Sequence, residues 1–177
     1  MIRTAAAPLL VATALALVGC QTAAERPAAP LGHAVLYFAD GRPAGTAQLL
    51  AAGDSVAVAA ELSGLPAGTH AVHLHTTGKC EAPSFTSAGG HLNPGMHQHG
   101  KDNPMGAHMG DLPNVEVGAD GSASFKVTLP GAKDMVLADI YDADGTAIMV
   151  HEKADDYRTD PTGNAGSRIA CGVFEAH

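Results

Sequence analysis

The sequence predicts an all-β domain, built as a sandwich or a flattened barrel, on two observations. Short runs that alternate apolar and polar residues recur from about residue 33 to residue 174, as expected of strands with one buried face. Glycine, proline, asparagine and aspartate separate these runs, and no long stretch keeps a helical period. A chain of 177 residues is long enough for one such domain with a core of ordinary size.

Residues 1–19 differ from the rest of the chain and are typical of an export signal. An arginine near the start is followed by an apolar run that ends in the letters LVGC at Cys20, and this run is too short for a convincing membrane span. The segment resembles a bacterial lipoprotein signal, so we expect residues 1–19 to be removed and Cys20 to carry lipid, including palmitate. An ordinary secretory signal with an incidental cysteine is the alternative.

Residues 20–32 are rich in alanine and proline and have no strand or helix period, which predicts a tether between the lipid and a domain that spans residues 33–177. The protein is then exported and anchored by lipid to a bacterial membrane, facing the periplasm or the cell exterior. Three cysteines leave one unpaired in an exported chain. Lipidation of Cys20 removes this oddity and leaves Cys80 and Cys171 free to form a disulfide in an oxidising compartment.

Seven runs are predicted to contain the strands: residues 33–39, 45–52, 55–63, 70–75, 114–129, 135–151 and 168–174. The last two long runs contain Asp-Gly pairs at 120–121 and 144–145, which favour hairpin turns between antiparallel strands. Residues 76–113 and 152–167 do not fit the strand rhythm. Because loops of this length are uncommon in a compact domain unless they are functional, we expect something to order them.

Histidines are concentrated where the strands end and in the first long loop. His73 and His75 are two residues apart on a predicted strand, so their side chains share one face about 7 Å apart at Cα; a chelating pair and a solvated face both fit this spacing. His151 ends another strand and could join them in a nitrogen-rich copper site. The loop offers a zinc-type set of imidazoles and one carboxylate, in which either His97 or His99 could serve beside His91, His108 and Asp111.

Several motifs together resemble the copper/zinc superoxide dismutase family. They are HAVHLH followed by Cys80, GGHLNP, HMGDLPN, VHEKADD and GNAGSRIACG, in the family's order and spacing between His33 and Phe174. The resemblance implies an eight-stranded Greek-key β-barrel of immunoglobulin-like sandwich form with two long functional loops. It also implies one copper ion and one zinc ion per chain.

The resemblance further implies which residues bind the metals. Copper would take His73, His75, His91 and His151. Zinc would take His91, His99, His108 and Asp111, so that His91 bridges the two ions. Asp155 would accept hydrogen bonds from one ligand of each metal and so fix their tautomers.

The activity implied by the resemblance is the disproportionation of superoxide to molecular oxygen and hydrogen peroxide, with Arg168 guiding the anion and His91 passing a proton. The net charge is −8, or −9 once Arg3 is removed, so we expect no nucleic-acid partner. An anionic substrate then needs a local positive field, supplied by Arg168 and the metals. The sequence leaves open whether Lys153 and Arg158 contribute.

Three other histidines are expected to be structural or solvated. His70 lies on the apolar face of its strand, and His33 and His177 lie at the domain edges, where no role is predicted. Two other functions are compatible with parts of the sequence: an extracytoplasmic copper and zinc buffer with a dismutase-like fold, and a surface adhesion domain. The buffer would not require Arg168. The sequence is compatible with a monomer and with a homodimer.

Overall fold

The computed structural model describes Met1 and residues 30–177, and the first strand begins at Pro30, three residues before the predicted start of the domain. Cys20, residues 2–19 of the predicted signal peptide and most of the predicted tether lie outside the described residues. The described chain forms the strands β1 Pro30–Phe38, β2 Pro43–Ala52, β3 Ser55–Leu62, β4 Gly68–His70, β5 Val72–His75, β6 Val115–Val117, β7 Ala123–Thr128, β8 Ala147–His151, β9 Arg168–Val173 and β10 Glu175–Ala176. One α-helix, α1 Lys133–Ile140, and one 3-10 helix, Thr86–Ala88, complete it.

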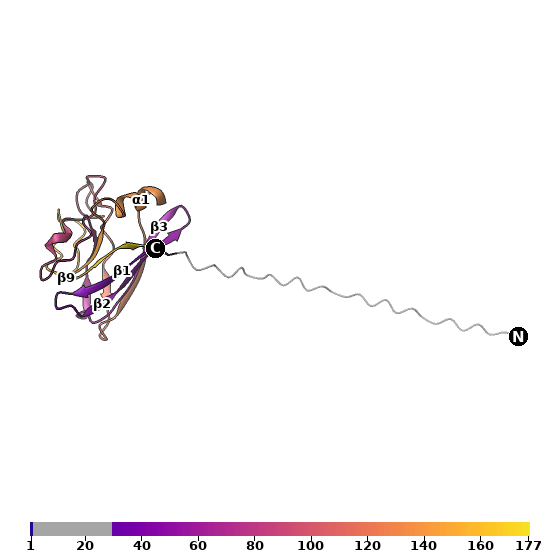
Figure 1. Ribbon diagram of the computed structural model, residues 1–177, viewed down its shortest axis with the longest axis horizontal. Coiled ribbons are helices and arrows are strands. Elements are labelled where there is room, and N and C mark those ends of the chain that lie inside the picture. Colours follow the sequence, from indigo (N-terminus) through magenta and orange to yellow (C-terminus); the bar gives the residue numbers. More distant parts are fainter. Residues whose placement is uncertain (2–29) are drawn as a thin grey trace.

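Most of the strands form one curled antiparallel sheet (Figure 1). Its order is β5-β8-β9-β1-β2-β3-β7, with β10 paired to β1, and a separate ladder joins β4 to β6. Because β4 runs into β5 through Ala71 and β6 leads into β7, the β4–β6 ladder connects the two edges of the main sheet. Counting β4 and β5 as one bent strand and setting the two-residue β10 aside, the barrel has the eight strands that the resemblance implies.

Four pairs of neighbouring strands are far apart in sequence, β5 with β8, β3 with β7, β1 with β9 and β4 with β6, as Greek-key connections require. The all-β barrel is therefore confirmed. Two long connections link strands of the barrel. Residues 76–113 are called the first loop below, and residues 152–167 are called the second loop.

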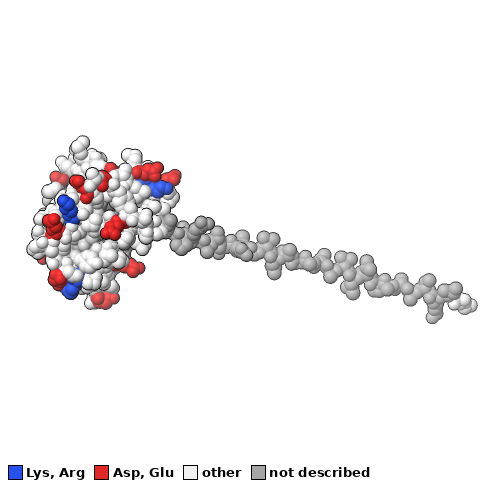
Figure 2. All heavy atoms as spheres, viewed as in Figure 1, with Lys and Arg blue, Asp and Glu red and all other residues white. Residues whose placement is uncertain are grey.

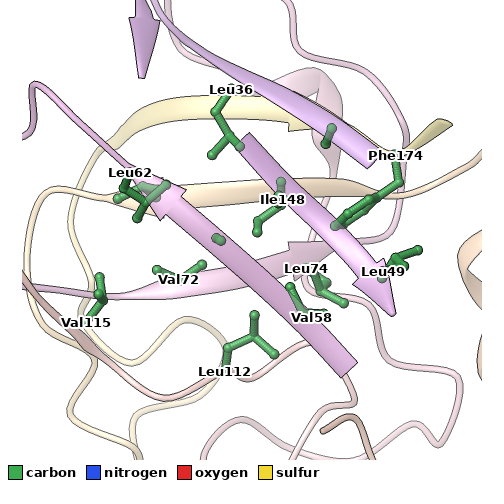
Figure 3. Packing of buried hydrophobic residues seen from close by; sticks show 14 of the residues in the cluster. Leu36, Leu49, Val58, Leu62, Val72, Leu74, Leu112, Val115, Ile148 and Phe174 are labelled. Carbon is green, nitrogen blue, oxygen red and sulfur yellow. The ribbon is translucent and has the colours of Figure 1, made fainter. Parts of the chain in front are cut away.

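Apolar side chains from several strands fill the barrel because alternate residues of each strand point inward. Leu36, Val58 and Ile148 are fully buried in this cluster, and Figure 3 shows them facing one another from different strands. Leu74 of β5 belongs to the same core. His73 and His75, its neighbours on the strand, must then face the outside of the barrel, where the loops cover them.

The structure corrects two strand predictions. Met135–Ile140, predicted as a strand, lies within α1; Val136 and Ile140 are buried four residues apart on one helix face, while Met135 is 69% exposed. The Asp144-Gly145 turn therefore joins a helix to β8 and makes no hairpin. No helix among the described residues has the length and apolar character needed to cross a membrane.

The other Asp-Gly pair, Asp120-Gly121, lies in a tight turn closed by a hydrogen bond from the Gly118 N–H to the Ser122 carbonyl. It connects β6 to β7, but these strands pair with β4 and β3, so the predicted hairpin is also wrong. The predicted strand 70–75 is divided into two strands, because β4 pairs with β6 whereas β5 pairs with β8. The break lets the chain turn from one face of the barrel to the next.

Candidate metal centre

The strand register brings three histidines together on the outside of the barrel. His73 lies opposite Met149 in the β5–β8 ladder, so His151 is its diagonal neighbour, with ring centroids 4.8 Å apart. His75, two residues after His73, has its ring centroid 5.6 Å from that of His151. All three side chains are buried.

His91 joins them from the first loop. Its backbone forms an antiparallel bridge with His75, and the next residue, Leu92, donates its N–H to the Leu74 carbonyl at 2.8 Å. The ring centroid of His91 is 4.0 Å from that of His73. These contacts complete the four-histidine group, His73, His75, His91 and His151, whose ligand atoms all lie within 4.8 Å of one another.

The orientation of these rings leaves four lone pairs directed at one point. Five buried side-chain nitrogen or oxygen atoms in the described chain have no hydrogen-bond partner, and four of them are His73 Nδ1 and the Nε2 atoms of His75, His91 and His151. The opposite nitrogens are engaged: His73 Nε2 donates to Asp155 at 2.8 Å and His75 Nδ1 to the Gly89 carbonyl at 3.0 Å. Unpaired buried nitrogens are costly, and a cation that prefers imidazole, such as copper, would satisfy them.

The second group, called the Asp111 group, is His91, His99, His108 and Asp111. Asp111 Oδ1 is 2.9 Å from His91 Nδ1, 3.0 Å from His99 Nδ1 and 3.1 Å from His108 Nδ1. In a tetrahedral zinc site each ligand atom is roughly 2.0–2.1 Å from the ion, which places any two ligand atoms slightly more than about 3 Å apart. The distances from Asp111 Oδ1 to the three ring nitrogens are close to this value, so this set fits zinc. The choice left open between His97 and His99 is thereby resolved, because His97 is exposed and His99 is buried in the group.

His73 also lies within 4.8 Å of His91, His99 and Asp111. We place it in the four-histidine group because its Nε2 is already bonded to Asp155 and its free Nδ1 belongs to that group. His108 completes the Asp111 group, since its Nδ1 lies 3.3 Å from His91 Nδ1 as well.

Asp155 connects the two groups, as the resemblance implies. Its carboxylate accepts from His73 Nε2 at 2.8 Å and from His99 Nε2 at 2.9 Å, which leaves the other nitrogen of each ring free for a metal. Gly163 makes this possible. A Cβ added there would lie 1.9 Å from Asp155 Oδ1 and 2.6 Å from His99 Nε2, and its φ of +64° is in any case the left-handed region that favours glycine.

Burial sets the protonation of three histidines of the four-histidine group, His75, His91 and His151. It lowers the pKa of His91 to about 4 and that of His151 to about 3, and the nearby imidazoles add to the effect in His151. The pKa of His75 falls to about 2 for the same reason. These rings are therefore neutral at physiological pH, which is the form that binds a metal.

His99 behaves in the opposite way because it lies between two carboxylates. Burial alone would lower its pKa, but hydrogen bonds with Asp111 and Asp155 raise the pKa of His99 to about 9. Burial alone would raise the pKa of Asp111, but hydrogen bonds from His91 and His99 hold it well below its usual range. The metal-free Asp111 group thus carries a proton that a bound zinc would replace.

Arg168 begins β9 next to the four-histidine group and is fixed by the first loop. Its guanidinium donates to the Phe85 carbonyl at 2.7 Å and to the Gly89 carbonyl at 2.6 Å. The Gly89 carbonyl also accepts from His75, so one backbone oxygen positions both side chains. The predicted disulfide between Cys80 and Cys171 is present and ties this part of the loop to β9.

Sequence analysis did not identify the residues that join the two loops. Asn114 donates its side-chain N–H to the Asp155 carbonyl at 2.9 Å and accepts the Asp155 N–H at 2.8 Å. Tyr157 donates its N–H to Asp155 and receives the Asn114 N–H on its hydroxyl at 2.7 Å. Lys101 lies over the Tyr157 ring at 4.1 Å. No spacing rule in the sequence points to such contacts between loops.

The remaining predicted residues are placed as follows. His70 is buried, with its ring nitrogens 2.8 Å from the His151 carbonyl and 2.9 Å from the Pro66 carbonyl, in the structural role expected. Lys153 and Arg158 are exposed on the second loop. Carboxylates outnumber Lys and Arg on the face seen in Figure 2, in keeping with the acidic composition.

Comparison with known proteins agrees with this geometry. Residues 43–174 match the family described as copper/zinc superoxide dismutase (SODC). The chain is 40% identical over 150 residues to superoxide dismutase [Cu-Zn] 1 of Aquifex aeolicus, covering 81% of this chain and 86% of that protein. It is 47% identical over 111 residues to the superoxide dismutase-like protein YojM of Bacillus subtilis, a match that spans 62% of this chain and 57% of YojM.

A solved structure is also similar. It is a double mutant of a superoxide dismutase-like protein from Bacillus subtilis, with a TM-score of 0.75 at 40% identity over 82% of this chain and 98% of that chain. Fold, donor groups and relatives lead to one conclusion. The chain belongs to the copper/zinc superoxide dismutase family.

Proposed function

We propose that this protein disproportionates superoxide to oxygen and hydrogen peroxide outside the cytoplasm, with copper in the four-histidine group and zinc in the Asp111 group. The observation that carries the proposal is His91, whose Nε2 belongs to the first group while its Nδ1 belongs to the second. One imidazole can therefore connect a redox-active ion to a redox-silent one.

Bound copper would supply the alternate one-electron oxidation and reduction, and bound zinc would order the loop and polarise His91. The residues of the chain supply the proton transfer. His91 holds a proton at Nε2 in one half of the cycle and donates it to the peroxide in the other, while the second proton comes from water. Two superoxide ions and two protons thus give one oxygen and one hydrogen peroxide.

Arg168 attracts the substrate. A guanidinium on the order of 6 Å from the anion, at an effective dielectric near 20, contributes about 3 kcal/mol before screening by salt. Its hydrogen bonds to the Phe85 and Gly89 carbonyls keep the charge beside the four-histidine group. Two of its five N–H donors are used there, which leaves others for the anion.

The proposed location rests on the sequence and the disulfide. Cys20, in the lipoprotein-like segment, would be acylated and hold the protein at the bacterial membrane. The Cys80–Cys171 disulfide is of the kind that persists in oxidising compartments. Mass spectrometry of the intact protein extracted from membranes should show a mature chain that begins at Cys20 with lipid mass; a mature chain without lipid would contradict the anchor.

A copper and zinc buffer is the second candidate, and the name of YojM, a superoxide dismutase-like protein, is the observation in its favour. Arg168 discriminates between the two because metal storage does not need it. We expect Arg168→Ala to slow superoxide decay about tenfold while the metal content stays normal, and Arg168→Glu to slow it more. Arg42→Ala is the control: it removes an exposed arginine paired with Asp40 and should not change the rate.

The measurement is superoxide decay on protein whose copper and zinc have been quantified. The wild-type rate should also fall as ionic strength rises, because attraction of an anion is screened. A fully loaded wild-type protein without dismutase activity would instead favour the buffer. Equal rates in wild type and Arg168→Glu would remove this residue from the mechanism.

A further inference from the structure

A second cluster of metal-binding side chains lies outside the metal centre, where β10 pairs with the start of β1. His33 is directly opposite Glu175 in this antiparallel pair, and Gly32 is opposite Ala176. The His177 N–H donates to the Leu31 carbonyl at 3.3 Å, which continues the pairing by one residue. His33, Glu175 and His177 therefore project from the same face of a two-stranded ribbon.

The geometry of this cluster repeats part of the four-histidine group. In the four-histidine group, His73 is opposite Met149, and His151 lies two residues after Met149 on the same strand. The ring centroids of His73 and His151 are 4.8 Å apart. Here, His33 is opposite Glu175 and its ring meets that of His177, also two residues further along, at 5.4 Å. The same diagonal of an antiparallel ladder thus presents two imidazoles in both places.

A carboxylate completes the second cluster. His33 Nε2 is 3.9 Å from Glu175 Oε2, and both side chains are exposed, by 46% and 75%. Two donors of one transition-metal ion lie roughly 3 Å apart, so the His33 and Glu175 atoms need to approach by about 1 Å, and the His177 ring must turn toward them. The His33 and Glu175 side chains are exposed enough to rotate toward each other.

We propose that His33, Glu175 and His177 form a surface site for a divalent transition-metal ion, with Cu²⁺ as the tightest ligand. Two imidazoles and one carboxylate are a nitrogen and oxygen donor set, for which Cu²⁺ has the highest affinity among the first-row divalent ions. The site goes beyond the proposed dismutase function. Its three exposed donors leave coordination positions open to water, so it binds more weakly than the buried groups and exchanges its ion with the surroundings.

The test uses the whole protein, without a polyhistidine tag, after both buried sites have been filled with copper and zinc. Titration with CuCl₂, followed by calorimetry and by the electron paramagnetic resonance spectrum of Cu²⁺, should show one further equivalent with a distinct spectrum. His33→Ala and His177→Ala should each weaken this binding by about tenfold or more, and Glu175→Gln should weaken it less.

His97→Ala is the matched control, because His97 is an exposed histidine outside both metal groups. It should leave the additional equivalent unchanged, and none of the four variants should alter the dismutase rate of the loaded protein. The altered side chains are at the surface, so the variants should keep the wild-type melting temperature. Absence of the additional equivalent in wild type, or its persistence in the double variant His33→Ala/His177→Ala, would overturn the proposal.

Discussion

The two metal groups differ in what positions their ligands. Three ligands of the four-histidine group, His73, His75 and His151, lie on paired strands whose other face belongs to the barrel core. All four members of the Asp111 group come from the first loop, between residues 91 and 111. The barrel can therefore hold the first set in place without a metal, whereas the second set depends on the order of a loop.

The first loop is organised around Asp111 itself. Asp111 Oδ1 meets the three ring nitrogens, and Oδ2 accepts the N–H groups of Gly100 and His108, both at 2.9 Å. One carboxylate thus links the metal donors to the loop backbone. Binding of zinc and ordering of this loop should be coupled, while copper binding should depend mainly on the strands.

The largest effect is expected for Asp111→Ala. A structural zinc contributes roughly 10–16 kcal/mol shared among four ligands, so loss of one should weaken zinc binding by about a hundredfold or more. Copper binding should change much less, because three of its proposed ligands are on strands. Zinc and copper affinities measured by competition with chelators, and hydrogen exchange of the first loop, provide the check.

Asp144→Ala is the control, since Asp144 is exposed and lies in the turn before β8. It should keep both affinities. If Asp111→Ala retained its zinc, or if it lost copper and zinc together, the contrast between strand-held and loop-held ligands would be wrong.

Gly163→Ala should affect both groups through Asp155. A methyl group at this position overlaps the hydrogen bond between Asp155 and His99, so the carboxylate must move away from both histidines. Loss of such a supporting hydrogen bond typically costs about 10–100-fold in metal affinity. Gly53→Ala is a matched control, because Gly53 has a similar φ of +62° with open space around it. Both variants carry the same backbone strain, and only Gly163→Ala should lose metal in a competition assay.

The pH dependence of zinc binding should reveal the proton on His99. The pKa of His99 is raised to about 9 in the metal-free protein, so below that pH one proton must leave before its Nδ1 can bind zinc. The zinc affinity should therefore rise about tenfold per pH unit between pH 7 and 9 and level off above. Zinc titrations at several pH values, with chelator competition corrected for pH, give the slope. A flat profile would show that His99 is already neutral.

Strand spacing allowed part of this site to be predicted from the sequence. His73 and His75 share a face because they are two residues apart, and no other information is needed to bring them together. His99 could not be separated from His97 in the same way, because a loop has no fixed period. The family resemblance supplied that choice, and the burial of His99 agrees with it.

The missed features are those that depend on tertiary contacts. Residues 135–140 carry strand-like apolar residues, yet they form α1, because Val136 and Ile140 can both reach the barrel core from one helix face. Asn114 and Tyr157 are polar residues in loops 43 positions apart, and only the folded chain places the hydroxyl of one on the backbone of the other. Patterns within a segment cannot report such contacts.

The smallest effect is expected at Tyr157, which connects the two loops without touching a metal group. Tyr157→Phe keeps the ring beneath Lys101 but removes the oxygen that accepts the Asn114 N–H at 2.7 Å. A partly buried donor left unpaired costs about 1 kcal/mol or somewhat more, so the unfolding free energy of the metal-free protein should fall by that amount. Zinc affinity should fall only a few fold, because Asn114 still holds Asp155 through its side chain. Tyr37→Phe, which alters a half-exposed tyrosine on β1, should leave both quantities unchanged. Urea unfolding and zinc competition on the two variants measure the difference, and an equal loss in both would mean that the Tyr157 hydroxyl does not couple the loops.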